Sequence, residues 1–128
     1  MVFSVTFPTR HTDTFAATGY VHAGVLLSLT ELAYAEFEKH VEIAKPDHVV
    51  AVQTETHATY HSPLSWEEGA VVDVQTTDLE ERSFTQEFAI RSEASDRRIA
   101  TFVHHWVWMD TREGRSVELP DDVRAKFR

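Results

Sequence analysis

Residues 22–40 read HAGVLLSLTELAYAEFEKH, and this stretch decides the fold. It contains no proline and is rich in leucine, alanine and glutamate, all of which favour an α-helix. Over its first three turns apolar residues lie almost all round the axis, which is typical of a buried helix. Pro46 lies after this stretch and is expected to mark the end of the segment that follows the helix. We therefore predict one long, buried central helix.

The segments on either side of this helix alternate with the period of two that is typical of strands. We expect a short strand within residues 1–9 and four further strands along the C-terminal part, over residues 49–61, 70–77, 83–93 and 98–110. Strands joined by such short polar turns are mainly antiparallel. A last short helix is expected from Pro120 to Lys126. The pattern predicts an α+β fold, one helix against a curled antiparallel sheet.

Strand alternation also predicts which side chains share a face. Within residues 49–61, Thr54 and Thr56 are expected on one face, and Gln53, Glu55 and His57 on the other. No internal repeat or linker interrupts the chain, so residues 1–128 are expected to form a single domain.

Composition excludes several classes of function. The 21 acidic and 12 basic side chains give a formal net charge of -9, which repels nucleic acid. The absence of cysteine removes disulfides and a thiol nucleophile. Neither a signal peptide nor an apolar run long enough to cross a membrane is present, so we expect a cytoplasmic protein with no membrane partner.

Glu31 is the one ionisable side chain within the apolar first turns of the predicted helix. A carboxylate there would lose hydration and would need a partner. Carboxylates in such surroundings are often catalytic acids or bases. A structural ion pair across a subunit interface explains the position equally well.

The segment GYVHAGVLLSLTELAYAEF, residues 19–37, resembles the helix entry of 4-hydroxybenzoyl-CoA thioesterase-type hotdog enzymes. Glu31 lies nine residues beyond His22, as the carboxylate does in one branch of that family. Residues 10–14, RHTDT, resemble the Arg-x-x-Asp-Thr start of the other branch. In that branch a second aspartate is catalytic, and here Phe15 takes its place. The later segments TYHSPLSWEEGAVVDVQ, SFTQEFAI and LPDDVRAKF resemble the family in the same order.

The resemblance implies a hotdog fold with a five-stranded sheet, and an acyl-CoA thioester hydrolase that forms a homodimer or a dimer of dimers. It implies Glu31 as general base or nucleophile, and backbone N–H groups at the helix start as an oxyanion hole. The expected site residues are Glu31, His22 and Asp13 for catalysis, and Ala23, Gly24, His57 and Tyr60 for substrate binding.

Eight histidines raise the question of a metal site. His57 and His61 would lie about 13 Å apart on a strand, which is too far for one ion. We therefore expect neither a metal nor a cofactor. Two other functions remain open: a hotdog hydratase or dehydratase acting on acyl thioesters, and a non-catalytic subunit that binds them.

Overall fold

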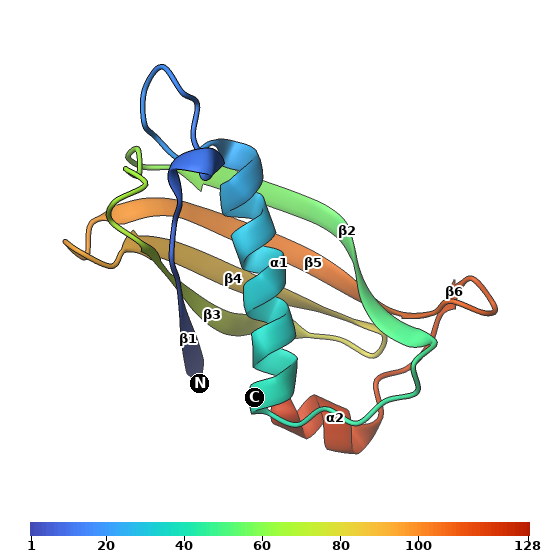
Figure 1. The fold of residues 1–128 in the computed structure, drawn as a ribbon. Helices are drawn as coiled ribbons and strands as arrows, with labels where there is room; N and C mark the ends of the chain where they lie inside the picture. Colours follow the sequence, from blue (N-terminus) through green and yellow to red (C-terminus); the bar gives the residue numbers. More distant parts are fainter.

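The computed structural model describes residues 1–128 as one antiparallel sheet and two helices (Figure 1). In chain order the elements are β1 (Val2–Phe7), a 3-10 turn (His11–Asp13), α1 (Ala23–His40), β2 (Val49–Tyr60), β3 (Ala70–Leu79), β4 (Ser83–Ser92), β5 (Arg98–Asp110), β6 (Arg115–Ser116) and α2 (Asp121–Lys126). The strands follow the order β1-β3-β4-β5-β2, and β6 pairs with β5 as a sixth strand. The predicted α+β fold of one long helix against an antiparallel sheet is confirmed, with β6 as an unpredicted addition.

The predicted helix forms because both of its ends are capped. His22 is extended, and its ring accepts a hydrogen bond from the N–H group of Val25 at 3.4 Å. At the other end Glu42 has a φ of 56°. This left-handed residue lets Ile43 donate to the carbonyl of Glu38, which closes the helix.

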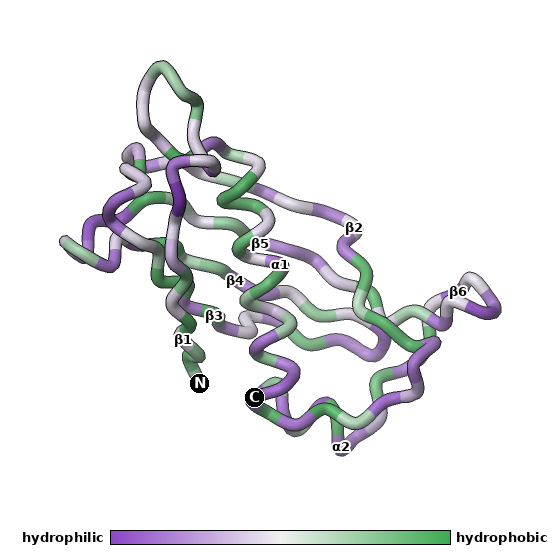
Figure 2. The backbone as a smooth tube through the Cα atoms, in the orientation of Figure 1, coloured by the Kyte–Doolittle hydropathy of each residue, from purple (hydrophilic) through white to green (hydrophobic).

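Only one side of α1 is buried, so the prediction of a helix buried on every side is wrong. Figure 1 shows α1 lying across one face of the sheet, and no element covers its other side. Figure 2 shows that the N-terminal half of α1 is mostly apolar and that its C-terminal half is mostly polar. The face toward the sheet buries Leu26, Leu29, Thr30, Ala33, Tyr34 and Phe37. Leu32, on the outer side, is 53% exposed because a single layer of sheet can cover only one side of a helix.

A β-bulge in β2 determines which of its side chains face α1. Gln53 pairs with Trp106 and Glu55 with His105, so Thr54 is the extra residue. Beyond the bulge Thr56 pairs with His104, which lies on the helix side of β5. Gln53 and Thr56 therefore point to the same side of the sheet. The prediction that Gln53 shares a face with Glu55 and His57 is wrong, since a bulge shifts the alternation by one residue.

Candidate active site

The N-terminus of α1 presents two backbone N–H groups without an acceptor. The N–H groups of Ala23 and Gly24 donate no hydrogen bond within the chain, and both residues are exposed. His22 precedes them and its own backbone N–H donates to the carbonyl of Asp13 at 3.1 Å. A carbonyl oxygen that enters here meets two free donors and the positive end of the helix dipole.

A cavity of about 400 Å³ opens beside this helix end. Its lining comes from the start of α1 and from the chain that leaves β2: Val21, Ala23, Leu26, Tyr60, His61, Ser62, Pro63 and Leu64. The structure thus brings Ala23 and Tyr60 together, as expected for residues of one binding site. No carboxylate lines this cavity, and the ring of Tyr60 packs edge-on against Phe102.

Glu31 lies on the outer side of α1, two turns after Gly24. Their positions differ by seven residues, so both occupy one side of the helix, about 10 Å apart along the axis. Glu31 is exposed in the single chain, and the expectation of a carboxylate buried in apolar surroundings is wrong because α1 is covered on one side only. Its one side-chain partner is Gln53, whose Nε2 donates to Glu31 Oε1 at 3.3 Å.

Asp13 lies beside α1 in a different cavity, of about 420 Å³. Its carboxylate accepts hydrogen bonds from the backbone N–H of Arg10 at 2.9 Å and from the Arg10 guanidinium at 3.4 Å. The lining includes Val25 and Leu32 but not Glu31, so the two carboxylates share no cavity. Phe15, at the family's second aspartate position, is 66% exposed and packs on the ring of His22.

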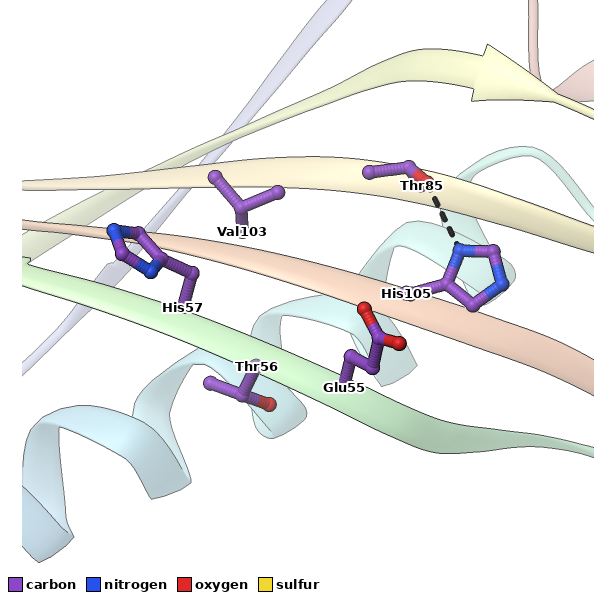
Figure 3. Close-up of a pocket in the computed structure, with 6 residues that line it drawn as sticks. All are labelled: Glu55, Thr56, His57, Thr85, Val103 and His105. Carbon is purple, nitrogen blue, oxygen red and sulfur yellow. Dashed lines mark hydrogen bonds between the residues drawn. The ribbon is translucent and has the colours of Figure 1, made fainter.

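His57 lies apart from the other expected site residues. It lines a pocket of about 450 Å³, and Figure 3 shows the lining side chains on the face of the sheet away from α1. Glu55 and His105 also line this pocket, and His105 Nδ1 lies 3.1 Å from the hydroxyl of Thr85. Within one chain His57 therefore lies away from α1, because the residues that flank Thr56 point to the opposite face. No group of three or more His, Asp or Glu side chains has an arrangement that could hold a metal ion.

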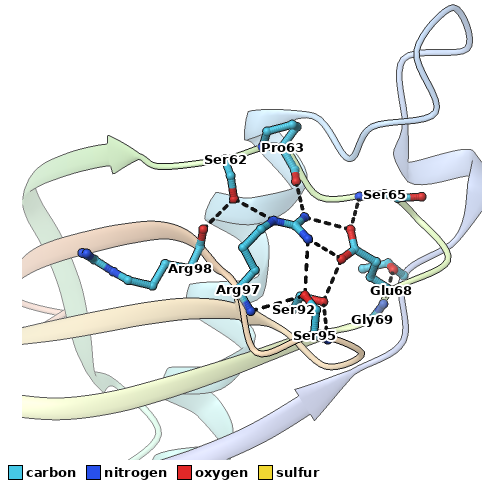
Figure 4. A network of polar contacts seen from close by, with 10 residues as sticks. Ser62, Pro63, Ser65, Glu68, Gly69, Ser92, Ser95, Arg97 and Arg98 are labelled. Carbon is cyan, nitrogen blue, oxygen red and sulfur yellow. Dashed lines mark hydrogen bonds and ion pairs between the residues drawn. The ribbon is translucent and has the colours of Figure 1, made fainter.

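An ion pair holds the loop that forms the outer wall of the 400 Å³ cavity (Figure 4). The Arg97 guanidinium donates to both oxygens of Glu68, at 2.9 and 3.0 Å, and to the carbonyl of Pro63 at 2.7 Å. Ser92 donates to Glu68 as well, at 2.9 Å. The hydrogen bond from Arg97 is the main cause that lowers the pKa of Glu68 from its ordinary 4.5 to about 2. The β4–β5 turn thus fixes the position of Pro63 beside the cavity.

The sequence profile of the thioesterase-like superfamily matches residues 9–127. The chain belongs to the thioesterase-like superfamily. The match includes every expected site residue, and it confirms the resemblance to hotdog thioesterases. No curated protein matches the sequence.

Solved structures of thioesterases share the hotdog architecture of this superfamily member. A 1,4-dihydroxy-2-naphthoyl-CoA thioesterase from Synechocystis superposes with a TM-score of 0.87 at 16% identity, over 99% of this chain and 96% of that one. A gentisyl-coenzyme A thioesterase superposes at 0.84 and 19% identity, over the whole of both chains. A thioesterase from Thermus thermophilus, complexed with coenzyme A and zinc, superposes at 0.81 and 24% identity, over 98% and 91%. These likenesses confirm the predicted fold.

The sequence did not predict that Gln53 contacts Glu31. No sequence pattern marks the bulge that turns Gln53 toward Glu31, because a bulge depends on how β2 pairs with β5.

Neither helix has the length and hydrophobicity that a membrane span requires.

Proposed function

We propose that this protein hydrolyses acyl-CoA thioesters to a carboxylic acid and CoA, with Glu31 as general base or nucleophile. One observation carries the proposal: two free backbone N–H groups and a carboxylate lie on one side of α1, two turns apart. A helical side chain tilts toward the N-terminus, so the Glu31 carboxylate reaches back toward those N–H groups. A thioester whose oxygen meets the N–H groups would place its carbonyl carbon between the two.

Two routes are chemically open to Glu31. As a base, it takes a proton from water while the water oxygen attacks the thioester carbon, and the C–S bond then breaks to release the CoA thiolate, which takes up a proton. As a nucleophile, it attacks the carbon itself, and the C–S bond breaks to release the CoA thiolate, which takes up a proton. Water then hydrolyses the resulting anhydride to the carboxylic acid and regenerates the Glu31 carboxylate. In both routes the N–H groups of Ala23 and Gly24 stabilise the negative oxygen.

His22 and Asp13 would act around this centre. The ring of His22 caps the helix through Val25, and its backbone is held by the carbonyl of Asp13, so both residues support the position of the oxyanion donors. A direct part for the Asp13 carboxylate stays a prediction, as does substrate contact by His57.

The 400 Å³ cavity supports acyl-CoA as the substrate. Arg98 lies at its rim, where its guanidinium donates to His61 Nε2 at 3.2 Å. Arg98 forms no ion pair with any carboxylate of the chain. In a protein with a net charge of -9, a free cation beside a cavity without carboxylates suits the phosphate groups of CoA.

The minimal unit in this proposal is a homodimer, which could pair further into a dimer of dimers. β2 is an edge strand with only β5 beside it, and unpaired strand edges favour association. Leu32 on the outer side of α1 is 53% exposed. A second copy over this side would cover it and enclose Glu31. Light scattering that gives a monomer mass at micromolar concentration would contradict this assembly.

Thiol release from a panel of acyl-CoA substrates tests the function. A thioesterase frees the CoA thiol, a hydratase or dehydratase changes enoyl absorbance without freeing it, and a binding subunit does neither. Glu31→Gln keeps the side-chain shape and removes the proton acceptor, so we expect kcat to fall by about 100-fold or more while the melting temperature holds. A stable, fully active Glu31→Gln protein rules out Glu31 as the catalytic group.

A further inference from the structure

A chain of hydrogen bonds runs from the buried side of α1 to Glu31 on its outer side. It starts at His104, which is completely buried on the helix side of β5. Both of its ring nitrogens meet a threonine hydroxyl: Nε2 lies 2.7 Å from Thr30 on α1, and Nδ1 lies 3.0 Å from Thr56 on β2. His104 thus joins the helix to the edge strand.

The chain continues through the bulged part of β2. The hydroxyl of Thr56 donates to Gln53 Oε1 at 3.2 Å, and Gln53 Nε2 donates to Glu31 Oε1 at 3.3 Å. Gln53 and Thr56 reach the same side only because of the bulge between Gln53 and Glu55. The strand irregularity therefore aligns two polar side chains between His104 and the proposed catalytic carboxylate.

The number of available protons decides which group donates and which accepts in each of these hydrogen bonds. Burial lowers the pKa of His104 to about 4, so the ring is neutral near pH 7 and carries one N–H group. Thr56 has a single proton. When that proton goes to Gln53, Thr56 must accept one from Nδ1 of His104, and the other ring nitrogen must accept from Thr30.

The other tautomer of His104 breaks the chain. The hydroxyl of Thr30 also lies 2.6 Å from the carbonyl of Leu27, to which it can donate. His104 would then carry its proton on Nε2, and Thr56 would have to donate to Nδ1 instead of to Gln53. Without that donor, the Gln53 carboxamide could turn over and set its oxygen against the carboxylate of Glu31.

We propose that His104, acting through Thr56, is a positioning residue that holds the Gln53 carboxamide with its N–H group toward Glu31. This inference rests on the catalytic role of Glu31 proposed above. An exposed glutamate has many rotamers, and a hydrogen bond from Gln53 to one carboxylate oxygen reduces them while the second oxygen stays free to react. Preorganisation of this kind raises kcat rather than substrate affinity.

Thr56→Val tests the inference, because it removes the hydroxyl with little change in shape and keeps a residue that favours strands. We expect kcat to fall about tenfold, the effect of losing one hydrogen bond to a charged group, with KM unchanged. Thr56→Ser restores a hydroxyl and should recover most of the rate. The matched control is Thr54→Val at the bulge, whose hydroxyl donates only to the carbonyl of His105.

A double-mutant cycle separates a positioning role from a structural one. If Thr56 acts through Glu31, Thr56→Val has no further effect on the residual rate of Glu31→Gln. An equal loss in both backgrounds, or a Thr56→Ser protein as slow as Thr56→Val, overturns the inference. A fully active Glu31→Gln protein would instead remove the proposed function itself, so the two failures are distinguishable. Variants of His104 are avoided because its ring is completely buried between α1 and β2, so replacing it would also disturb the core.

Discussion

Replacing Ala23 with proline would remove one proposed oxyanion donor while leaving the helix in place. Ala23 is the first residue of α1, where proline is favoured because its missing N–H makes no hydrogen bond within the helix. Proline also requires an extended residue before it, and His22 already has φ -80° and ψ 159°. The backbone therefore accepts Ala23→Pro without rearrangement, and we expect the melting temperature to stay the same or rise slightly.

The expected loss of activity follows from the unpaired N–H group of Ala23. Removal of one oxyanion donor costs about 2.7–4 kcal/mol of transition-state stabilisation, so kcat for thiol release should fall by about 10²–10³-fold. KM should change little, because the donor acts most strongly on the charge that develops during reaction.

Ala23→Val is the matched control, since it adds bulk at the cavity wall but keeps the N–H group. If the valine variant is as slow as the proline variant, the loss comes from crowding of the cavity. A folded Ala23→Pro protein with the rate of the original would refute the assignment of the helix start as an oxyanion hole.

Three further predictions concern charged side chains. Arg98→Gln should raise KM for acyl-CoA about tenfold but leave KM for a truncated thioester without phosphates unchanged. The control is Arg112→Gln, about 40 Å away beyond the far end of β5, which should change KM for neither substrate. Glu68→Gln should lower the melting temperature by about 5 °C at neutral pH. Because the folded-state pKa of Glu68 is lowered from 4.5 to about 2, this difference should be complete above about pH 5 and disappear in melting curves as the pH falls toward 2. If the Asp13 carboxylate takes part in catalysis, Asp13→Asn should reduce kcat well beyond any loss of stability. An unchanged rate would mean that Asp13 only stabilises the turn through its hydrogen bonds with Arg10.

The sequence predicted the local structure of this protein well. Residues 23–40 form a helix because strong helix formers fill this stretch and His22 caps its N-terminus, and both features lie within a few residues of one another. The strands follow from alternation in the same way. The spacing between Gly24 and Glu31 also sets which side of α1 they share, since a helix repeats every 3.6 residues.

Tertiary structure decided which of these side chains meet. Glu31 is exposed because the sheet covers α1 on one side only, and the sequence of the helix alone does not show which side is covered. Gln53 reaches Glu31 because a bulge shifts the register of β2 against β5. His104 contacts hydroxyl groups 74 and 48 residues away in the sequence. Such contacts depend on strand register and layer packing. Because register and packing arise from the whole chain, short sequence patterns cannot predict these contacts.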